Sequence, residues 1–134
     1  MIERPLENKE LGAISNLGLA YIGDGVYELL IRTHLVTQGG VRAGEMHKTA
    51  ITYVKAGAQA RAADVIKEQL SEEELAVYKR GRNAKTGSLP RGATPAEYHA
   101  ATGLEALFGY LYLRGEKDRI KELFAAIMEG SQCP

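Results

Sequence analysis

Apolar residues recur at helical intervals along most of the chain, and no stretch shows the strict alternation that marks a half-buried β-strand. The clearest case is a stripe of four residues spaced three or four apart, namely Leu19, Ile22, Val26 and Leu29. This spacing predicts a helix that turns the stripe towards a core. We therefore expect an all-α fold, built as a bundle of packed helices.

Residues that begin and end helices divide this pattern into five predicted segments. Ser71 with Glu74, and Thr94 with Glu97, form capping boxes, in which each side chain of the pair accepts a hydrogen bond from the other residue's backbone amide. Gly57 marks a place where the second segment can be interrupted. The predicted helices cover residues 16–37, 42–69, 71–78, 94–114 and 116–129, after a polar arm of residues 1–10 and before a stop at Gly130.

Length and composition limit the kinds of protein that this chain can be. With 134 residues, 45% of them hydrophobic, the chain is expected to form one domain, residues 1–134, and is too short for two. Its formal net charge is zero, so any binding to nucleic acid must come from local clusters of charge. Cys133 is the single cysteine, which excludes an intrachain disulfide and a zinc site built from several cysteines.

The sequence also favours a cytoplasmic protein without a membrane span. Charged residues occur at once in Met1-Ile-Glu-Arg-Pro5, where a secretory signal needs an apolar core. No run approaches the roughly 18 apolar residues of a membrane helix.

Two carboxylates stand alone in apolar, glycine-containing helical segments. Asp24 is the only charged residue from Leu17 to Tyr27, and Gly23 and Gly25 flank it. Glycines in a helix cost stability, so they indicate close approach of a metal with its waters, a nucleic-acid backbone or a second helix. The alternative interpretation of Asp24 is a buried acid that pairs with an arginine or caps a helix.

Residues 100–113 repeat this design, with Glu105 as their only charge. If the two helices pack together, Asp24 and Glu105 form an acidic site. Mg²⁺ is typically bound by one or two carboxylates together with waters and substrate phosphates. The sequence therefore indicates Mg²⁺ as a candidate cofactor.

These two segments resemble the motifs of a known family. Residues 19–28, Leu-Ala-Tyr-Ile-Gly-Asp-Gly-Val-Tyr-Glu, resemble the signature helix of the ribonuclease III endonuclease domain, and residues 104–113 resemble a later helix of that domain. Residues 44–48 are similar to the start of the helix between them. The resemblance implies the helical bundle of that domain and a Mg²⁺-dependent endoribonuclease that acts on double-stranded RNA. It also implies that Asp24 and Glu105 are the catalytic metal ligands and that the products carry 5′-phosphate and 3′-hydroxyl ends.

Two positions depart from the family pattern. Ala20 and Thr102 stand where the family usually has two further acids. This departure, with the lack of a double-stranded-RNA-binding domain, resembles the Mini-III branch and implies maturation of precursor 23S ribosomal RNA. The missing acids also favour an alternative, a catalytically silent RNA-binding module of the same fold. A helix-turn-helix DNA binder is less consistent, because no helix is dense in Arg, Asn and Gln.

A basic, acid-free stretch covers residues 79–94 and contains three glycines and a proline. We expect a flexible loop there, and basic side chains with free amides are what contacts to phosphates use. The alternative is an ordinary surface connection. The candidate RNA-binding residues are Arg80, Arg82, Asn83, Lys85 and Arg91.

The first long helix has more apolar surface than one core stripe requires. Leu17, Tyr21, Ile22, Tyr27 and Ile31 spread around it, which leaves a second surface for a partner. The family resemblance implies a homodimer in which Tyr21 inserts into the other subunit.

Overall fold

The computed structural model of this chain describes residues 4–85, 89 and 91–132, without the side chains of the last two. The middle of the basic stretch, residues 86–88 and 90, and Cys133 lie outside this description. The helices are α1 (Asn8–Gly12), α2 (Asn16–Gln38), η1 (Ala43–Glu45), α3 (Met46–Val54), α4 (Ala56–Ile66), η2 (Lys67–Gln69), α5 (Glu72–Arg82), α6 (Pro95–Leu113) and α7 (Lys117–Gln132). No strand occurs among the described residues, and the all-α prediction is confirmed.

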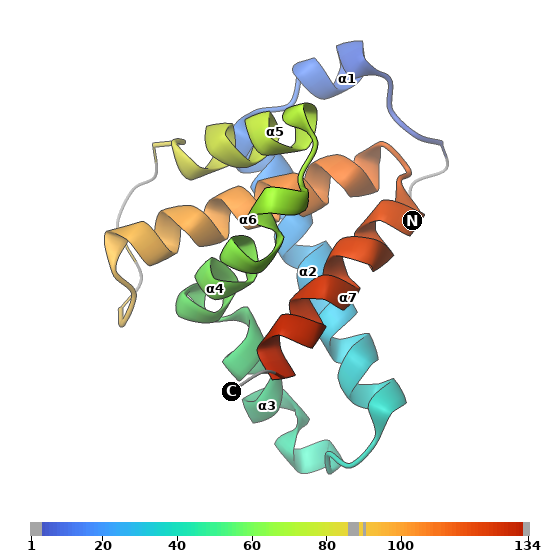
Figure 1. Cartoon of the computed structure of the whole chain (residues 1–134), viewed down its shortest axis with the longest axis vertical. Helices are drawn as coiled ribbons and strands as arrows, with labels where there is room; N and C mark the ends of the chain where they lie inside the picture. The colour runs from blue at the N-terminus through green and yellow to red at the C-terminus, as the bar shows by residue number, and fades with distance from the viewer. Residues whose placement is uncertain (1–3, 86–88, 90, 133–134) are drawn as a thin grey trace.

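Helix α6 lies at the centre of the molecule. It packs against α2, α4 and α5, and it crosses α2 in the first half of that helix, around Gly23 (Figure 1). Its apolar residues fill the interior: Leu104, Leu107, Phe108 and Leu111 are fully buried. A helix that is apolar on most sides needs such a central place.

Two glycines bring α2 and α6 together at their crossing. A Cβ atom on Gly23 would overlap the backbone carbonyl of Glu105, and a Cβ atom on Gly109 would overlap the carbonyl oxygen of Leu19. Only glycine permits this approach of two backbones. Of the three partners that Gly23 and Gly25 indicated, Gly23 therefore makes room for the second helix.

The buried face of α2 differs from the predicted stripe. Leu29 is 64% exposed, so its assignment to the core was wrong. The close contact at Gly23 turns a different face inward, and Tyr27 then packs edge-on against Phe108, with ring centroids 5.3 Å apart. The buried residues of α2 are Leu19, Ala20, Gly23, Tyr27, Ile31 and Leu35.

Several helix boundaries also differ from the predictions. The second segment breaks at Lys55, whose backbone is extended (φ −64°, ψ 155°), two residues before Gly57. Helix α5 continues to Arg82, so the first residues of the predicted basic loop lie in its last turn. Helix α7 continues past Gly130, because that glycine packs against Val65 instead of starting a turn.

Both predicted capping boxes are present. The Ser71 hydroxyl accepts from the Glu74 amide at 3.1 Å, and the Thr94 hydroxyl accepts from the Glu97 amide at 3.1 Å. Each glutamate carboxylate in turn accepts from the backbone amide of its capping residue. In the part of the chain that the structure describes, no helix combines the length and apolar character needed to cross a membrane.

Candidate active site

The crossing of α2 and α6 places Asp24 beside Glu105. Asp24 follows Gly23 directly, and the position of Gly23 lies against the backbone of Glu105. The pKa of the Glu105 carboxyl is raised to about 8, chiefly by burial, then by the negative charge of Asp24 and a hydrogen bond between the two carboxyl groups. The structure therefore brings together the two acids that the sequence singled out.

The surroundings of the two carboxyl groups differ. Asp24 is exposed, whereas Glu105 is half-buried. The interpretation of Asp24 as a buried acid paired with an arginine is thus wrong, and in the described residues no ion pair involves either Asp24 or Glu105. A Cβ atom on the neighbouring Gly25 would meet no described atom within 4 Å, which agrees with the exposure of Asp24.

Gln59 on α4 is the third polar side chain at this place, and the sequence reasoning missed it. The residue is 3% exposed. Its amide nitrogen donates to the Val54 carbonyl at 2.8 Å and approaches Glu105 Oε2 at 3.5 Å. This contact partly offsets the raised pKa of Glu105. One signal was available, because Gln59 is an uncharged polar residue in the alanine-rich stretch of residues 56–63.

The donor set suits a small divalent cation. Two oxygen-rich side chains face each other, one of them open to solvent, and Gln59 adds an amide oxygen that is buried without a hydrogen-bond partner among the described residues. Mg²⁺ takes one or two carboxylates and keeps several waters. No group of three or more His, Cys, Asp or Glu residues that could hold a metal occurs in residues 4–85, 89 and 91–132. The candidate metal site rests instead on the contact between the carboxyl groups of Asp24 and Glu105, with the Gln59 amide beside them.

The last turn of α5 lies against the turn of α6 that carries Glu105. A Cβ atom on Gly81 would stand 3.2 Å from the Thr102 carbonyl oxygen and 2.6 Å from Ala106 Cβ. Gly81 separates Arg80 from Arg82, so both arginines belong to this contact region.

The five candidate RNA-binding residues lie on and just beyond this turn. Arg80, Asn83, Lys85 and Arg91 are exposed. Arg82 is half-buried, lies over the ring of Tyr78 at 5.8 Å and donates to Asn83 Oδ1 at 3.4 Å. Arg80, Lys85 and Arg91 form no ion pair with any described residue.

Comparison with known proteins assigns the chain to a family. Residues 17–116 match the model of the Ribonuclease III domain. The chain belongs to the ribonuclease III domain family. It is 47% identical over 110 residues to the Mini-ribonuclease 3 of Symbiobacterium thermophilum, covering 82% of this chain and 85% of that protein. It is 36% identical over 116 residues to the Mini-ribonuclease 3 of Streptococcus pneumoniae, covering 85% and 91%.

A solved structure agrees with the fold. The crystal structure of a protein from Fusobacterium nucleatum superimposes with a TM-score of 0.80 at 34% sequence identity. The superposition covers 91% of this chain and 98% of the other. The ribonuclease III-like bundle expected from the two motifs is thus confirmed.

The two positions at which this ribonuclease III domain lacks family acids are closed to solvent. Ala20 is 6% and Thr102 is 5% exposed. The Thr102 hydroxyl donates to the Tyr98 carbonyl of its own helix at 3.0 Å. Neither residue adds a carboxylate to Asp24 and Glu105, and no group of three or more acids or other metal-binding side chains that could together hold a metal occurs among the described residues.

An exposed apolar stripe runs along the outer face of α2. Tyr21 is 82% exposed and lies one turn before Asp24. Of the residues that the sequence proposed as surplus apolar surface, Leu17 is also exposed, whereas Tyr27 and Ile31 are buried in the core. The exposed stripe consists of Leu17, Tyr21, Leu29 and Val36.

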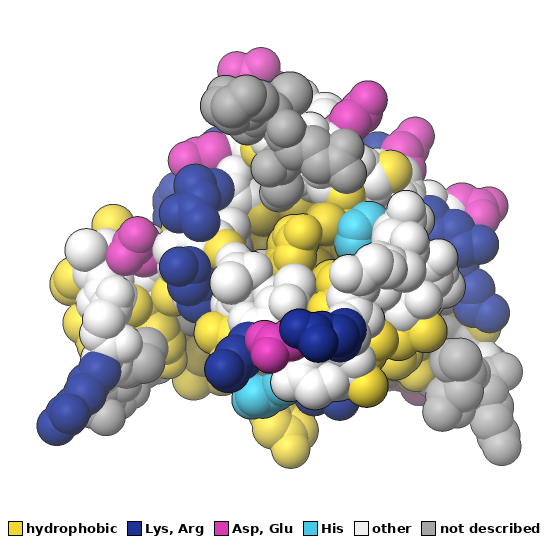
Figure 2. Space-filling model, turned by 90° about the horizontal axis from the view of Figure 1, so that it is seen from below, with side chains coloured by type: hydrophobic (Ala, Val, Ile, Leu, Met, Phe, Trp, Pro, Cys, Tyr) yellow, Lys and Arg dark blue, Asp and Glu magenta, His cyan; other side chains and the backbone are white. Residues whose placement is uncertain are grey.

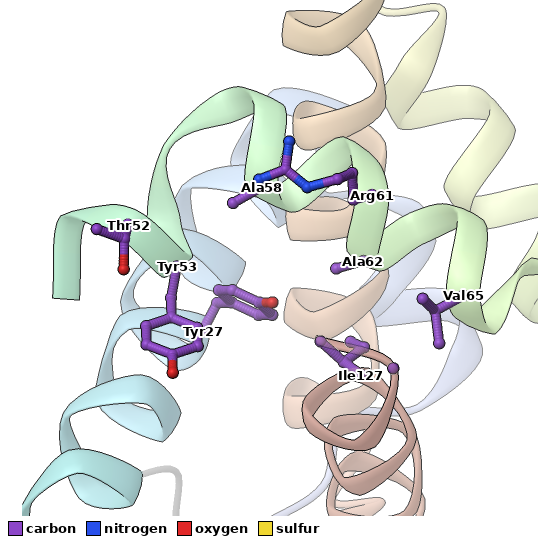
Figure 3. A pocket seen from close by; sticks show the side chains of 9 residues that line it. Tyr27, Thr52, Tyr53, Ala58, Arg61, Ala62, Val65 and Ile127 are labelled. Carbon is purple, nitrogen blue, oxygen red and sulfur yellow. The ribbon is translucent and has the colours of Figure 1, made fainter. Parts of the chain in front are cut away.

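A cavity of about 360 Å³ lies elsewhere, between α3, α4 and the end of α7 (Figure 3). Figure 2 views this end of the molecule and shows hydrophobic side chains on the floor of a hollow, with basic side chains around it. The cavity is lined by Tyr27, Thr52, Tyr53, Ala58, Arg61, Ala62, Val65, Ile127 and Gly130, and neither acid is among them. The acidic pair therefore lies outside this cavity, and its member Asp24 is exposed at the surface.

Proposed function

We propose that this ribonuclease III domain protein is a Mg²⁺-dependent endoribonuclease that cleaves double-stranded RNA at Asp24 and Glu105. One observation carries the assignment. Two carboxyl groups meet at the α2–α6 crossing, burial and mutual repulsion raise the pKa of one of them, and no described cation compensates their charge. Groups perturbed in this way concentrate at functional sites.

The chain contributes a rigid frame with one exposed and one half-buried ligand. Gly23 and Gly109 fix the separation of α2 and α6, so Asp24 and Glu105 are held in place before substrate binds. Asp24 and Glu105 would hold the Mg²⁺ ion, which would supply a bound water of lowered pKa and positive charge beside the phosphate. This chemistry needs no histidine base, and it leaves 5′-phosphate and 3′-hydroxyl ends.

The basic residues beside the site are proposed to hold the RNA backbone. Arg80, Arg82, Asn83, Lys85 and Arg91 lie on or beyond the last turn of α5, which packs on the α6 turn of Glu105. Contacts of this type position a duplex without reading its sequence. They would hold the phosphate backbone of the RNA next to Asp24 and Glu105.

We further propose that the protein works as a homodimer built on α2. The exposed apolar side chain of Tyr21 supports this, since buried aromatic anchors often dominate interface energy. A two-fold dimer would present two acidic pairs, one for each strand of a duplex. Light scattering should give about twice the 14.6 kDa chain mass, and Tyr21→Asp should yield monomers. A monomeric parent protein that is fully active would contradict the dimer.

The similarity to the Mini-III branch supports precursor 23S ribosomal RNA as the natural substrate, met in the cytoplasm. Incubation with that precursor, followed by mapping of the new ends, tests this. Cleavage at scattered sites, as in a random duplex, would contradict a maturation role.

The central experiment incubates a long RNA duplex with the protein, with and without Mg²⁺. Defined fragments are expected only with Mg²⁺, and Asp24→Asn or Glu105→Gln should abolish them while RNA binding persists. Glu28→Gln is the matched control, since Glu28 lies one turn from Asp24 on α2 and pairs with Arg32 at the surface. Full activity in either site variant would remove the assignment. Binding without cleavage by the parent protein would favour the silent RNA-binding module.

A further inference from the structure

Gln59 links the backbone of one helix junction to the candidate metal site. Its amide nitrogen donates to the carbonyl of Val54, the last residue of α3, just before the extended Lys55. The same nitrogen approaches Glu105 Oε2 at 3.5 Å. The side chain is 3% exposed, so the α3–α4 junction and the α6 carboxylate hold it from both sides.

The amide oxygen of Gln59 lacks a hydrogen-bond donor among the described residues. Oε1 is buried and accepts no hydrogen bond from any described residue. Buried acceptors are almost always paired with protein or with an ordered water, and an unpaired one needs an explanation. The Val54 bond fixes the orientation of the amide, because exchanging oxygen and nitrogen would set Oε1 against the Val54 carbonyl. The oxygen therefore stays beside the nitrogen that faces Glu105.

The rest of α4 gives Gln59 no other apparent role. Ala58, Arg61, Ala62 and Val65 line the cavity of Figure 3. Gln59 does not line that cavity and instead contacts α6. An alanine or leucine would pack at a buried helix contact without leaving an unpaired oxygen.

We propose that Gln59 is a positioning residue of the metal site: its Nε2 orients the Glu105 carboxylate, and its Oε1 accepts a hydrogen bond from a water beside the ion. This inference rests on the proposed function, since it assumes that Asp24 and Glu105 hold a divalent cation. Mg²⁺ retains several waters, and these need acceptors in the surrounding protein. Residues that contact ligands in this way tune metal affinity strongly.

The test measures metal binding to the protein without RNA, using Mn²⁺ as the probe and electron paramagnetic resonance to count the free ion. Gln59→Met keeps the length and volume of the side chain and removes both polar atoms. It should weaken Mn²⁺ binding about tenfold or more. Gln38→Met, at the exposed end of α2, is the matched control and should bind as the parent does.

The stability of the same variants separates positioning from a merely structural role. Gln59→Met removes the unpaired buried oxygen but also the Nε2 donor to the Val54 carbonyl, and these two changes act in opposite directions, so its unfolding temperature should stay close to that of the parent. A lower unfolding temperature with unchanged Mn²⁺ affinity would overturn the proposal. If Gln59→Met does not fold, Gln59→Leu decides the matter, because it also removes both polar atoms at this buried helix contact and should likewise weaken Mn²⁺ binding. Undiminished Mn²⁺ binding by Gln59→Leu would also overturn the proposal.

Asp24→Asn distinguishes this inference from the function on which it rests. If Asp24→Asn and the parent bind Mn²⁺ equally, the acidic pair is not the metal site and the proposed function fails. If Asp24→Asn loses binding while Gln59→Met retains full affinity, only the role of Gln59 fails.

Discussion

Glu105 and Glu74 are two shielded glutamates of one protein, and their surroundings shift their pKa values in opposite directions. Glu74 is 7% exposed, and its carboxylate accepts from Arg119 Nε at 2.9 Å and from Arg119 Nη2 at 2.8 Å. The arginine fork and the Ser71 amide hold the pKa of Glu74 below its usual value. Glu105 lies beside the negatively charged Asp24, whereas Glu74 lies beside Arg119. Burial first, and then Asp24, raise the pKa of Glu105 to about 8.

The difference separates an acid that stabilises the fold from one that costs stability. Both carboxylate oxygens of Glu74 accept hydrogen bonds, from the Arg119 guanidinium and from the Ser71 amide. The charge of Glu74 therefore stabilises the fold. Within the described part of the chain, the one favourable contact of the Glu105 carboxylate is the 3.5 Å approach of the Gln59 amide nitrogen. Burying an ionised carboxylate is unfavourable unless a cation binds beside it. Such an acid is expected at a binding site and not at a position that stabilises the fold.

The largest expected effect comes from closing the space that holds the acidic pair together. Gly23→Ala should destabilise the protein by about 3 kcal/mol or more, because the new methyl group overlaps backbone atoms of α6 that cannot rotate away. Gly25→Ala is the control, since its Cβ meets nothing within 4 Å, and it should stabilise α2 by up to about 1 kcal/mol. Urea unfolding measures both. Equal stability of the two variants would show that the helices do not cross at Gly23.

The next effect tests the contrast between the two glutamates directly. Glu74→Gln should lower the free energy of unfolding by about 2 kcal/mol, since it weakens two charge-assisted hydrogen bonds from Arg119. Glu105→Gln should raise it by about 1 kcal/mol without metal, because it removes a carboxyl group whose pKa is raised to about 8 in the folded protein, first by burial and then by Asp24. Thermal melts with EDTA compare them. A loss of stability in both variants would mean that Glu105 is also a structural acid.

The sequence predicted the helices and the acidic pair because local signals specify both. Capping boxes marked two helix starts, and isolated charges marked Asp24 and Glu105. The sequence did not predict the contacts between residues that are far apart in the chain. The buried face of α2 follows from the Gly23 approach to α6, and no periodicity reveals the Arg119 partner of Glu74, 45 residues away. Gln59 was missed for the same reason, since its contact with Glu105 joins residues 46 apart.

Comparison of the parent protein with Glu74→Gln cancels the pH dependence that Glu10 and Glu105 contribute to both, and leaves that of Glu74. Its pKa is lowered in the folded protein, so its contribution is fully present above the usual value near 4.5 and is lost as pH falls through the folded value. The parent protein should therefore lose stability below about pH 4.5, by an amount approaching the effect of Glu74→Gln at neutral pH. Melting temperatures of both proteins, recorded from pH 3 to pH 7, should converge in acid. Parallel curves would exclude Glu74 as the group responsible.

The smallest effect concerns cations near the two glutamates. Arg119 is occupied by Glu74, whereas Arg80 and Lys85 form no ion pair among the described residues and so are free to contact phosphates. Replacing both with alanine should reduce the slope of log affinity against log salt by up to about 2, since each lost phosphate contact releases less counterion. Lys9 and Lys121, exposed on other helices, give the matched double variant. Filter binding to one duplex at several salt concentrations measures the slopes. Because total charge changes equally in the two double variants, an equal fall in both slopes would reflect net charge alone, and only a larger fall for Arg80 and Lys85 supports RNA contact at the last turn of α5.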